Sequence, residues 1–210
     1  MKKVIFTVTL LIIVSNASAG TWIGVGNYIP SQDTTYGILS TLTPKVVALR
    51  FGKNILFEPA VTASFRHLEN RTPVPGIDTF DVDFSHFGLD LKGYFPLFQS
   101  NSLVIYPFGG IGFFTETDKT TYRQDFGGIL SGDYDKTKTI GFRVPLGVAL
   151  QYRLSNYVSL GVDLESSFYY AKSSAEEKRG NTTTDLGSDS EYGVLIQNQV
   201  IRLMLFFGLN

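Results

Sequence analysis

The charged residues that could do chemistry in this sequence lie inside apolar segments, at every second position. In residues 158–170, for example, Asp163 and Glu165 alternate with Leu, Val and Phe. Successive side chains of a β-strand point to opposite faces, so these carboxylates would share one face and the apolar residues the other. The charged residues placed in this way are Arg50, Glu58, Arg66, Asp90, Lys92, Arg143, Asp163, Glu165 and Arg202.

Candidates for a catalytic base are few. The chain has 2 histidines, His67 and His86, and Ser85 is the sequence neighbour of the second. Adjacent residues of a strand face opposite ways, so Ser85 and His86 would not form the hydrogen bond that a nucleophile and its base require. His67 is expected at the rim of the structure. We therefore predict no catalytic residue.

Metal ligands are equally sparse. Asp81 and Asp83, and likewise Asp133 and Asp135, are carboxylate pairs in segments that we expect to be loops. Both pairs lack the EF-hand pattern and fit calcium poorly. We predict no metal and no cofactor, and we interpret these carboxylates as solvated loop charge.

The elements that position the charged set are β-strands. Alternation of period two is clearest in residues 140–152 and 158–170, which a tight hairpin connects. Gly109 and Gly110 mark a place where a β-bulge is expected. The predicted strands are residues 22–28, 46–51, 55–66, 87–92, 103–114, 140–152, 158–170 and 201–209.

The connections between these strands alternate in length. The long connections are residues 30–45, 68–78, 116–138 and 173–190, and the short ones are residues 52–54, 96–102 and 154–156. Successive connections of an up-and-down barrel lie at opposite ends, so every long loop would fall on one rim. Outer-membrane barrels have short periplasmic turns and long extracellular loops. The pattern predicts an all-β, transmembrane, up-and-down antiparallel barrel of about eight strands.

The N-terminus predicts export. Lys2 and Lys3 precede an apolar run, and Ala17 and Ala19 form a small-x-small cleavage site. We expect residues 1–19 to be a cleaved signal peptide and residues 20–210 to form one barrel domain. The net charge of −1 and the scattered basic residues exclude nucleic acid as a partner. With no cysteine, stability must come from packing and backbone pairing.

A soluble barrel of the lipocalin or avidin type is the main alternative, since it would turn the same apolar face inward. The strands are longer than the 5–6 residues usual in globular proteins. The polar faces mix glycine and alanine with charges of both signs, which suits a narrow lumen. Aromatic residues also gather at strand ends, as in interfacial girdles. These features favour the membrane barrel.

Residues 46–51, 106–114, 145–152 and 201–209 carry a resemblance to a known family. Over residues 20–210 the chain resembles the eight-stranded outer-membrane barrels of the OmpA/OmpX type. Family members commonly end on an aromatic residue that the barrel-assembly machinery recognises, whereas this chain ends Phe207-Gly208-Leu209-Asn210. The resemblance implies integral residence in the outer membrane, with membrane lipids, lipopolysaccharide and the assembly machinery as partners.

The expected function is structural or a surface interaction, with possible ligands bound by the extracellular loops. The charged face would form a lumenal salt-bridge network that plugs the barrel, because an eight-stranded interior is just wide enough for side chains. Two alternatives stay open. One is a small pore for small solutes, and the other is a lipid A-modifying outer-membrane hydrolase.

The barrel hypothesis predicts how the protein behaves on fractionation. The chain should be recovered with the outer membrane and should migrate differently in detergent gels before and after heating. Recovery as a soluble periplasmic protein would contradict the prediction.

Overall fold

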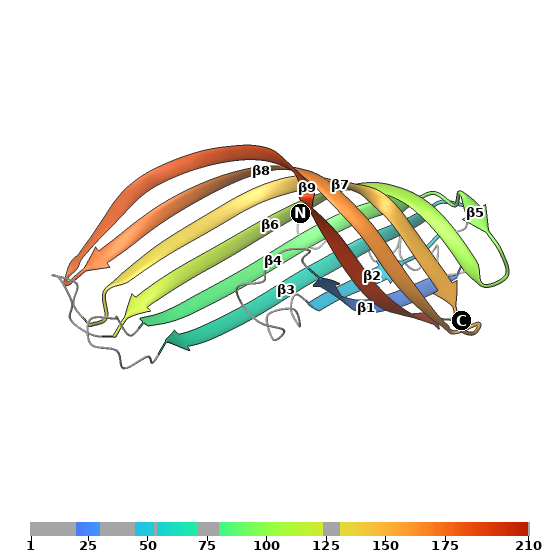
Figure 1. Ribbon diagram of the computed structural model, residues 1–210, viewed down its shortest axis with the longest axis horizontal. Helices are drawn as coiled ribbons and strands as arrows, with labels where there is room; N and C mark the ends of the chain where they lie inside the picture. The colour runs from blue at the N-terminus through green and yellow to red at the C-terminus, as the bar shows by residue number, and fades with distance from the viewer. Residues whose placement is uncertain (1–19, 30–44, 53, 71–79, 124–130, 210) are drawn as a thin grey trace, which may run out of the picture.

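The computed structural model describes residues 20–29, 45–52, 54–70, 80–123 and 131–209. Within them, no helix is long and apolar enough to cross a membrane. The strands are β1 (Thr21–Ile29), β2 (Lys45–Arg50), β3 (Leu56–Asn70), β4 (Phe80–Tyr94), β5 (Phe98–Gln99), β6 (Leu103–Tyr122), β7 (Tyr134–Arg153), β8 (Val158–Arg179) and β9 (Thr182–Leu209) (Figure 1).

The strands close into a ring. Their order is β4-β3-β2-β1-β9-β8-β7-β6-β5, and β4 also pairs with β6. β5 has only 2 residues and belongs to the turn between β4 and β6. Every pairing is antiparallel between sequence neighbours or between the first and last strands. The predicted all-β, up-and-down barrel of eight long strands is confirmed.

The short turns lie at one end of the molecule, together with the start of β1 and the end of β9. β1 and β9 meet where Thr21 pairs with Leu209, and the Gly208 amide donates to the Tyr157 carbonyl across 2.8 Å. The β2–β3 turn needs Gly52, whose φ of 127° suits glycine, and a Cβ there would lie 2.1 Å from the Ile55 carbonyl oxygen. These turns form the rim that we expect on the periplasmic side.

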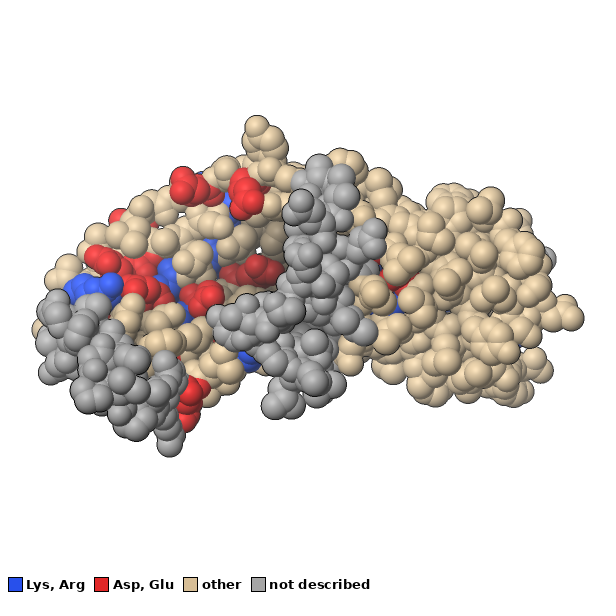
Figure 2. Space-filling model, viewed as in Figure 1, with Lys and Arg blue, Asp and Glu red and all other residues tan. Residues whose placement is uncertain are grey.

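The two faces of the barrel wall differ as the alternation predicts. On β7, Leu146 and Val148 are exposed on the outside, while Ala149 between Val148 and Leu150 is buried. The same alternation runs around the ring, with Phe57, Leu91 and Leu203 also exposed. Figure 2 shows charged side chains gathered over one half of the molecule and nearly absent from the half that holds the short turns. The apolar half is the part whose surface suits hydrocarbon.

The loop lengths predicted for two connections were wrong. β6 continues to Tyr122 and β7 begins at Tyr134, so most of residues 116–138 is strand. Residues 173–190 are also strand, because β8 ends at Arg179 and β9 begins at Thr182. The apolar alternation stops partway along these strands, although the backbone pairing continues. The other two long connections fall largely outside the described residues.

The prediction of a β-bulge at Gly109 and Gly110 was also wrong. The register of β6 with β4 runs unbroken through both residues. A Cβ at Gly110 would lie 2.4 Å from the Leu91 carbonyl oxygen, so this glycine allows close approach rather than a phase shift. The register shifts lie instead between β8 and β9, at Glu165/Ser167 and at Ala175/Glu176.

The described residues of the outer part of the sheet belong to fewer strands than the ring has. β1 pairs with β9 only as far as Ile201, and β2 pairs with β3 only as far as Ala63. Beyond these points, six strands (β3, β4, β6, β7, β8 and β9) continue side by side (Figure 1). β8 has 22 residues, about twice the 9–11 that a tilted strand needs to cross a bilayer. The described structure is therefore a closed barrel that continues into a polar extension of six strands.

A substitution at two heights of β8 tests the position of the lipid. Leu164 and Ser174 both face outward and are exposed, Leu164 on the apolar half and Ser174 on the polar extension. Leu164→Arg should destabilise the barrel by about 2–4 kcal/mol, and Ser174→Arg by about 0–1 kcal/mol. Urea titration of the protein in lipid vesicles measures both. Equal losses would place the membrane elsewhere.

Candidate functional site

The interior near the short turns holds a first cluster of buried charges. Arg50 Nη2 lies 2.6 Å from Glu58 Oε2, and Arg202 Nη2 lies 2.5 Å from Glu58 Oε1. Arg202 Nε also donates to Asp163 Oδ2 across 2.9 Å. All four side chains are at most 1% exposed. Glu58 thus lies between two guanidinium groups, and Arg202 between two carboxylates.

A second cluster lies beside the first. Lys92 of β4 pairs with Glu165 of β8 across the interior. Arg143 Nη1 is 3.9 Å from Glu165 Oε1, and its Nη2 is 2.6 Å from Asp90 Oδ2. Arg143 Nε also donates to Asp90 Oδ1 across 3.0 Å, which makes the contact bidentate. The cluster joins three regions of the ring, namely β4, β7 and β8.

Tyr94 links opposite sides of the barrel. Its hydroxyl lies 3.0 Å from Glu58 Oε1 and 2.9 Å from Asp163 Oδ2, and it also accepts a hydrogen bond from Arg202. The guanidinium carbon of Arg50 lies 4.2 Å from the centre of the Tyr94 ring. Extending the alternation of β4 from Lys92 by two residues would have placed Tyr94 inside. Sequence reasoning missed this residue because it followed the charges only.

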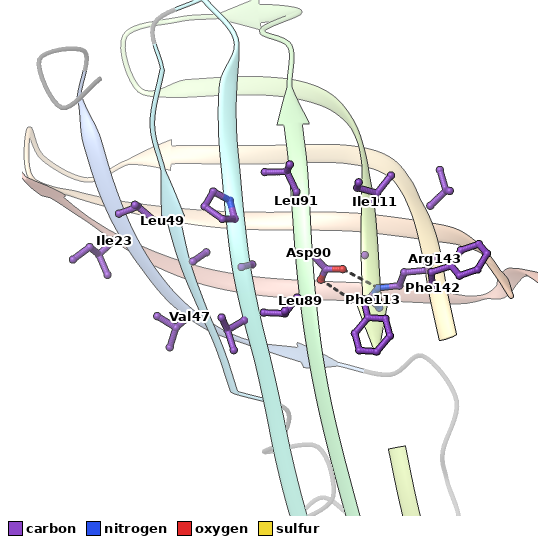
Figure 3. Close-up of a pocket in the computed structure, with 16 residues that line it drawn as sticks. Ile23, Val47, Leu49, Leu89, Asp90, Leu91, Ile111, Phe113, Phe142 and Arg143 are labelled. Atoms are coloured by element: carbon purple, nitrogen blue, oxygen red, sulfur yellow. Dashed lines mark hydrogen bonds and ion pairs between the residues drawn. The ribbon is translucent and has the colours of Figure 1, made fainter. Parts of the chain in front are cut away.

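A glycine makes room for the Asp90–Arg143 pair. Asp90, Gly112 and Arg143 are opposite one another on three neighbouring strands, β4, β6 and β7. A Cβ at Gly112 would lie 2.0 Å from Asp90 Oδ1, so the pair can only form across a residue without a side chain. Figure 3 shows the two side chains meeting, among apolar residues such as Leu91 and Ile111 that line a hollow of about 860 Å³ in the wall.

Aromatic rings pack around the charges. The guanidinium carbon of Arg50 lies 4.2 Å from the centre of the Phe206 ring. Lys92 Nζ lies 5.0 Å from the centre of the Phe108 ring. The Phe206 ring fits because it faces two glycines. A Cβ at Gly24 would lie 2.5 Å from the ring, and a Cβ at Gly161 would lie 2.8 Å from it. A hollow of about 330 Å³ opens at the short-turn end, and Arg50, Tyr106 and Gln151 lie among its lining residues.

Arg66 stands apart from both clusters. It is half-buried near the outer end of β3, with its guanidinium carbon 6.0 Å from the Phe84 ring centre. It also lines a hollow of about 400 Å³ together with residues of β4, β6 and β7. The structure thus brings together every residue of the predicted charged set except Arg66. The alternation placed Arg66 correctly on the strand but could not show that it lies beyond the clusters.

The carboxylates expected in loops belong to strands or their ends. Asp81 and Asp83 are residues of β4, and Asp135 is a residue of β7. Asp133 is buried and accepts a hydrogen bond from the Gly180 amide across 2.7 Å, so it fixes the neighbouring β8–β9 hairpin. The prediction of loop positions was wrong for Asp81, Asp83 and Asp135, because the polar extension retains strand pairing. Asp133 does precede β7, but it is buried rather than solvated.

A polar cluster on the outer wall contains His67. Its Nδ1 lies 2.6 Å from Asp83 Oδ1, and this hydrogen bond raises the pKa of His67. His67, Glu69 and Asp81 bring possible ligand atoms within 4.8 Å of one another. Arg123 already contacts the carboxylates, with its Nε 2.5 Å from Asp81 Oδ2. We interpret this arrangement of His67, Glu69, Asp81 and Arg123 as a cluster of ion pairs.

The histidines do not form a nucleophile–base pair in the described structure. His86 faces the interior, where its Nδ1 lies 2.9 Å from Glu116 Oε1, whereas Ser85 lines the hollow on the outer wall. His67 is on that outer wall, but its Nε2 lies 3.5 Å from Glu69 Oε1 and has no hydrogen bond to a hydroxyl. No hydrogen-bonded hydroxyl–histidine pair supports hydrolase chemistry among these residues.

Comparisons with known proteins give a likeness in fold. No protein-family model matches the sequence, and no curated protein matches it. A major outer membrane protein of Thermus thermophilus is similar in structure, with a TM-score of 0.55, 14% sequence identity, and coverage of 90% of this chain and 98% of that one.

Two further structures show weaker likeness. Ail, the attachment invasion locus protein of Yersinia pestis, has a TM-score of 0.45 and 11% identity, and covers 90% of this chain and 97% of its own. Outer membrane protein W of E. coli has a TM-score of 0.43 and 13% identity, with coverage of 91% and 98%. The closed ring and the Thermus likeness together give this chain the fold of a small outer-membrane β-barrel protein.

Proposed function

We propose that this chain is an integral outer-membrane barrel with a closed lumen, which anchors an extended polar β-sheet for a structural or surface-interaction role. The observation that carries the proposal is the buried ion-pair network, in which Arg50, Glu58, Lys92, Asp163 and Arg202 have almost no exposed surface. A polypeptide that fills its own interior in this way is suited to anchoring rather than to transport.

The energetics of buried charge support a permanent plug. An ion taken out of water costs several kcal/mol, and this is offset only by a well-placed partner and further hydrogen bonds. Glu58 meets both Arg50 and Arg202, and Lys92 meets Glu165. Opening a passage would separate these partners. The network is therefore a stable filling of the barrel.

The pore alternative has less support. Eight strands enclose an interior that side chains can fill completely. The 330 Å³ hollow at the short-turn end is lined by Arg50 and Tyr106, which belong to the filled region. Deeper in the barrel, Tyr94 and Arg202 bridge β4 and β9. A solute entering from this end would meet the charged network.

The polar extension supports a surface role. Every residue from 181 to 190 is exposed, although all of them except Asn181 and Leu186 are paired in the β8–β9 hairpin. The hairpin is braced next to its turn, where Arg179 Nη2 lies 2.7 Å from Asp135 Oδ1. A rigid sheet with solvent on both faces offers side chains and backbone to a partner, and such exposed segments are where binding residues concentrate. Outer-membrane residence places this sheet outside the cell.

Removing one member of the network should be costly. Arg202→Met leaves Glu58 and Asp163 short of a partner, so we expect a loss of about 3–5 kcal/mol of unfolding free energy. Arg153→Met, at an exposed position of the short-turn end, should change it by less than about 0.5 kcal/mol. Reversible urea unfolding in vesicles compares the two. Similar small losses in both variants would show that the network contributes little.

The closed lumen predicts that the wild-type protein does not conduct ions. The wild-type chain in planar bilayers should give no steady conductance. The double variant Lys92→Ser/Glu165→Ser removes a buried pair without leaving a lone charge, and it should introduce measurable conductance steps.

A matched control is the half-buried pair of Lys136 and Glu176 on the outer wall, whose charged atoms lie 2.9 Å apart on β7 and β8. Replacing both residues by Ser should introduce no conductance steps. Steady conductance of the wild type would contradict the plug and favour the pore.

A further inference from the structure

The lumen is hollowed between the charged network and the short turns. A hollow of about 330 Å³ is lined there by residues of β1, β2, β3, β6 and β7, and its buried lining residues Arg50, Tyr106 and Gln151 face the interior. This volume is near the lower end of the range of roughly 300–1,000 Å³ that is usual for small-molecule sites. We call it the short-turn hollow. It is large enough to hold one small ligand.

The short-turn hollow carries positive charge that its lining does not offset. Two guanidinium groups, those of Arg50 and Arg153, line it, and none of its described lining residues is acidic. Arg50 is already paired with Glu58, since Arg50 Nη2 lies 2.6 Å from Glu58 Oε2. Arg153, the last residue of β7, is exposed and forms no ion pair with another residue of the described ranges. The uncompensated charge is therefore that of Arg153.

Tyr106 offers a hydrogen-bond donor that the protein itself does not use. The residue is 8% exposed, and its ring packs edge-on against Tyr94, with the two ring centres 6.2 Å apart. Its hydroxyl forms no hydrogen bond with any residue in the part of the chain that the structure describes. A buried hydroxyl without a partner is costly, so a ligand that accepts a hydrogen bond from it gains affinity.

The floor of the hollow is held in place before any ligand arrives. Arg50 Nη1 donates to Gln151 Oε1 across 3.1 Å, and Gln151 Nε2 donates to Ser159 Oγ across 2.7 Å. A guanidinium group has five N–H donors and an amide has two, so these contacts and the ion pair with Glu58 leave further donors on both side chains. Donors that are already fixed lose little entropy when they bind a ligand.

The lining also contains apolar surface. Trp22 of β1 is half-buried, and Leu56 of β3 packs against the buried cluster to which Tyr106 belongs. Small-molecule sites combine such surfaces with a few polar groups that fix the orientation of the ligand. The hollow therefore fits a compact apolar body that carries an acceptor group with negative charge.

We propose that the short-turn hollow binds a small organic anion of the periplasm. Its carboxylate or phosphate group would accept hydrogen bonds from Arg153 and from the Tyr106 hydroxyl, because guanidinium groups form strong, charge-assisted hydrogen bonds with both anions. Its apolar body would contact Trp22 and Leu56. The inference goes beyond the proposed function, since a ligand can enter from the short turns without passing the charged network.

Fluorescence titration of the folded protein in detergent micelles tests the proposal. Trp22 is the only tryptophan of the chain, so its emission reports directly on the hollow. The probes are benzoate and phenyl phosphate, which share an aromatic body, and the neutral benzyl alcohol. At constant ionic strength, we expect both anions to bind at least about tenfold more tightly than the alcohol.

Four variants identify the groups that bind the anion. Arg153→Gln should weaken the binding of both anions at least about tenfold, and Tyr106→Phe, which removes only the hydroxyl, about three- to tenfold. Arg153→Lys keeps the charge and should bind both anions more tightly than Arg153→Gln. Lys138→Gln removes an exposed cation at the opposite end and should change nothing. Heat-modifiable migration confirms that each variant is folded.

The outcomes separate the possibilities. Benzyl alcohol binding as tightly as the anions, or Arg153→Gln binding them as the wild type does, would overturn the site. An unchanged Trp22 emission with both anions would do the same. Tighter binding of phenyl phosphate than of benzoate identifies phosphate as the charged group of the ligand, and the reverse order identifies a carboxylate. Conductance in planar bilayers tests the proposed plug separately.

Discussion

The alternation of side chains across a closed sheet is the constraint on which the rest of this structure depends. Hydrocarbon offers no hydrogen bonds, so a strand can cross it only within a closed ring, and its charges must face inward. Leu164 faces out because the ring turns Asp163 and Glu165 in. The interior must then compensate those charges, and it does so with the side chains of arginine, lysine and tyrosine.

Small residues make this compensation possible. Gly112 lets Asp90 reach Arg143 over an intervening strand, and Gly24 and Gly161 accept the ring of Phe206. Glycine weakens a strand because it packs nothing and loses more backbone entropy on folding. Here that cost is offset by filling the narrow lumen. The glycine-rich inner face is therefore part of the proposed plug, as much as the charged residues are.

Alternation let the sequence predict the fold class, the facing of most strands and the membership of the inner charged set. It could not predict the strand ends, because beyond the membrane both faces meet water and residues such as Thr182 and Lys178 carry no apolar pattern. Nor could it find the bridging role of Tyr94, which depends on strands far apart in sequence, or the position of Arg66 beyond the two charged clusters.

Lipid outside and a dry, filled lumen inside is the central claim, and the absence of cysteine allows a direct test by single-cysteine spin labelling. Nitroxides would be placed in the folded barrel at Ser159 and Leu160, adjacent residues of β8 with exposures of 0% and 45%. The account predicts that lipid-soluble oxygen relaxes the label at Leu160, whereas a water-soluble relaxation agent reaches neither position. Strong relaxation of the Ser159 label by the water-soluble agent would contradict the filled lumen, and oxygen access at Ser159 in place of Leu160 would reverse the assignment of the two faces.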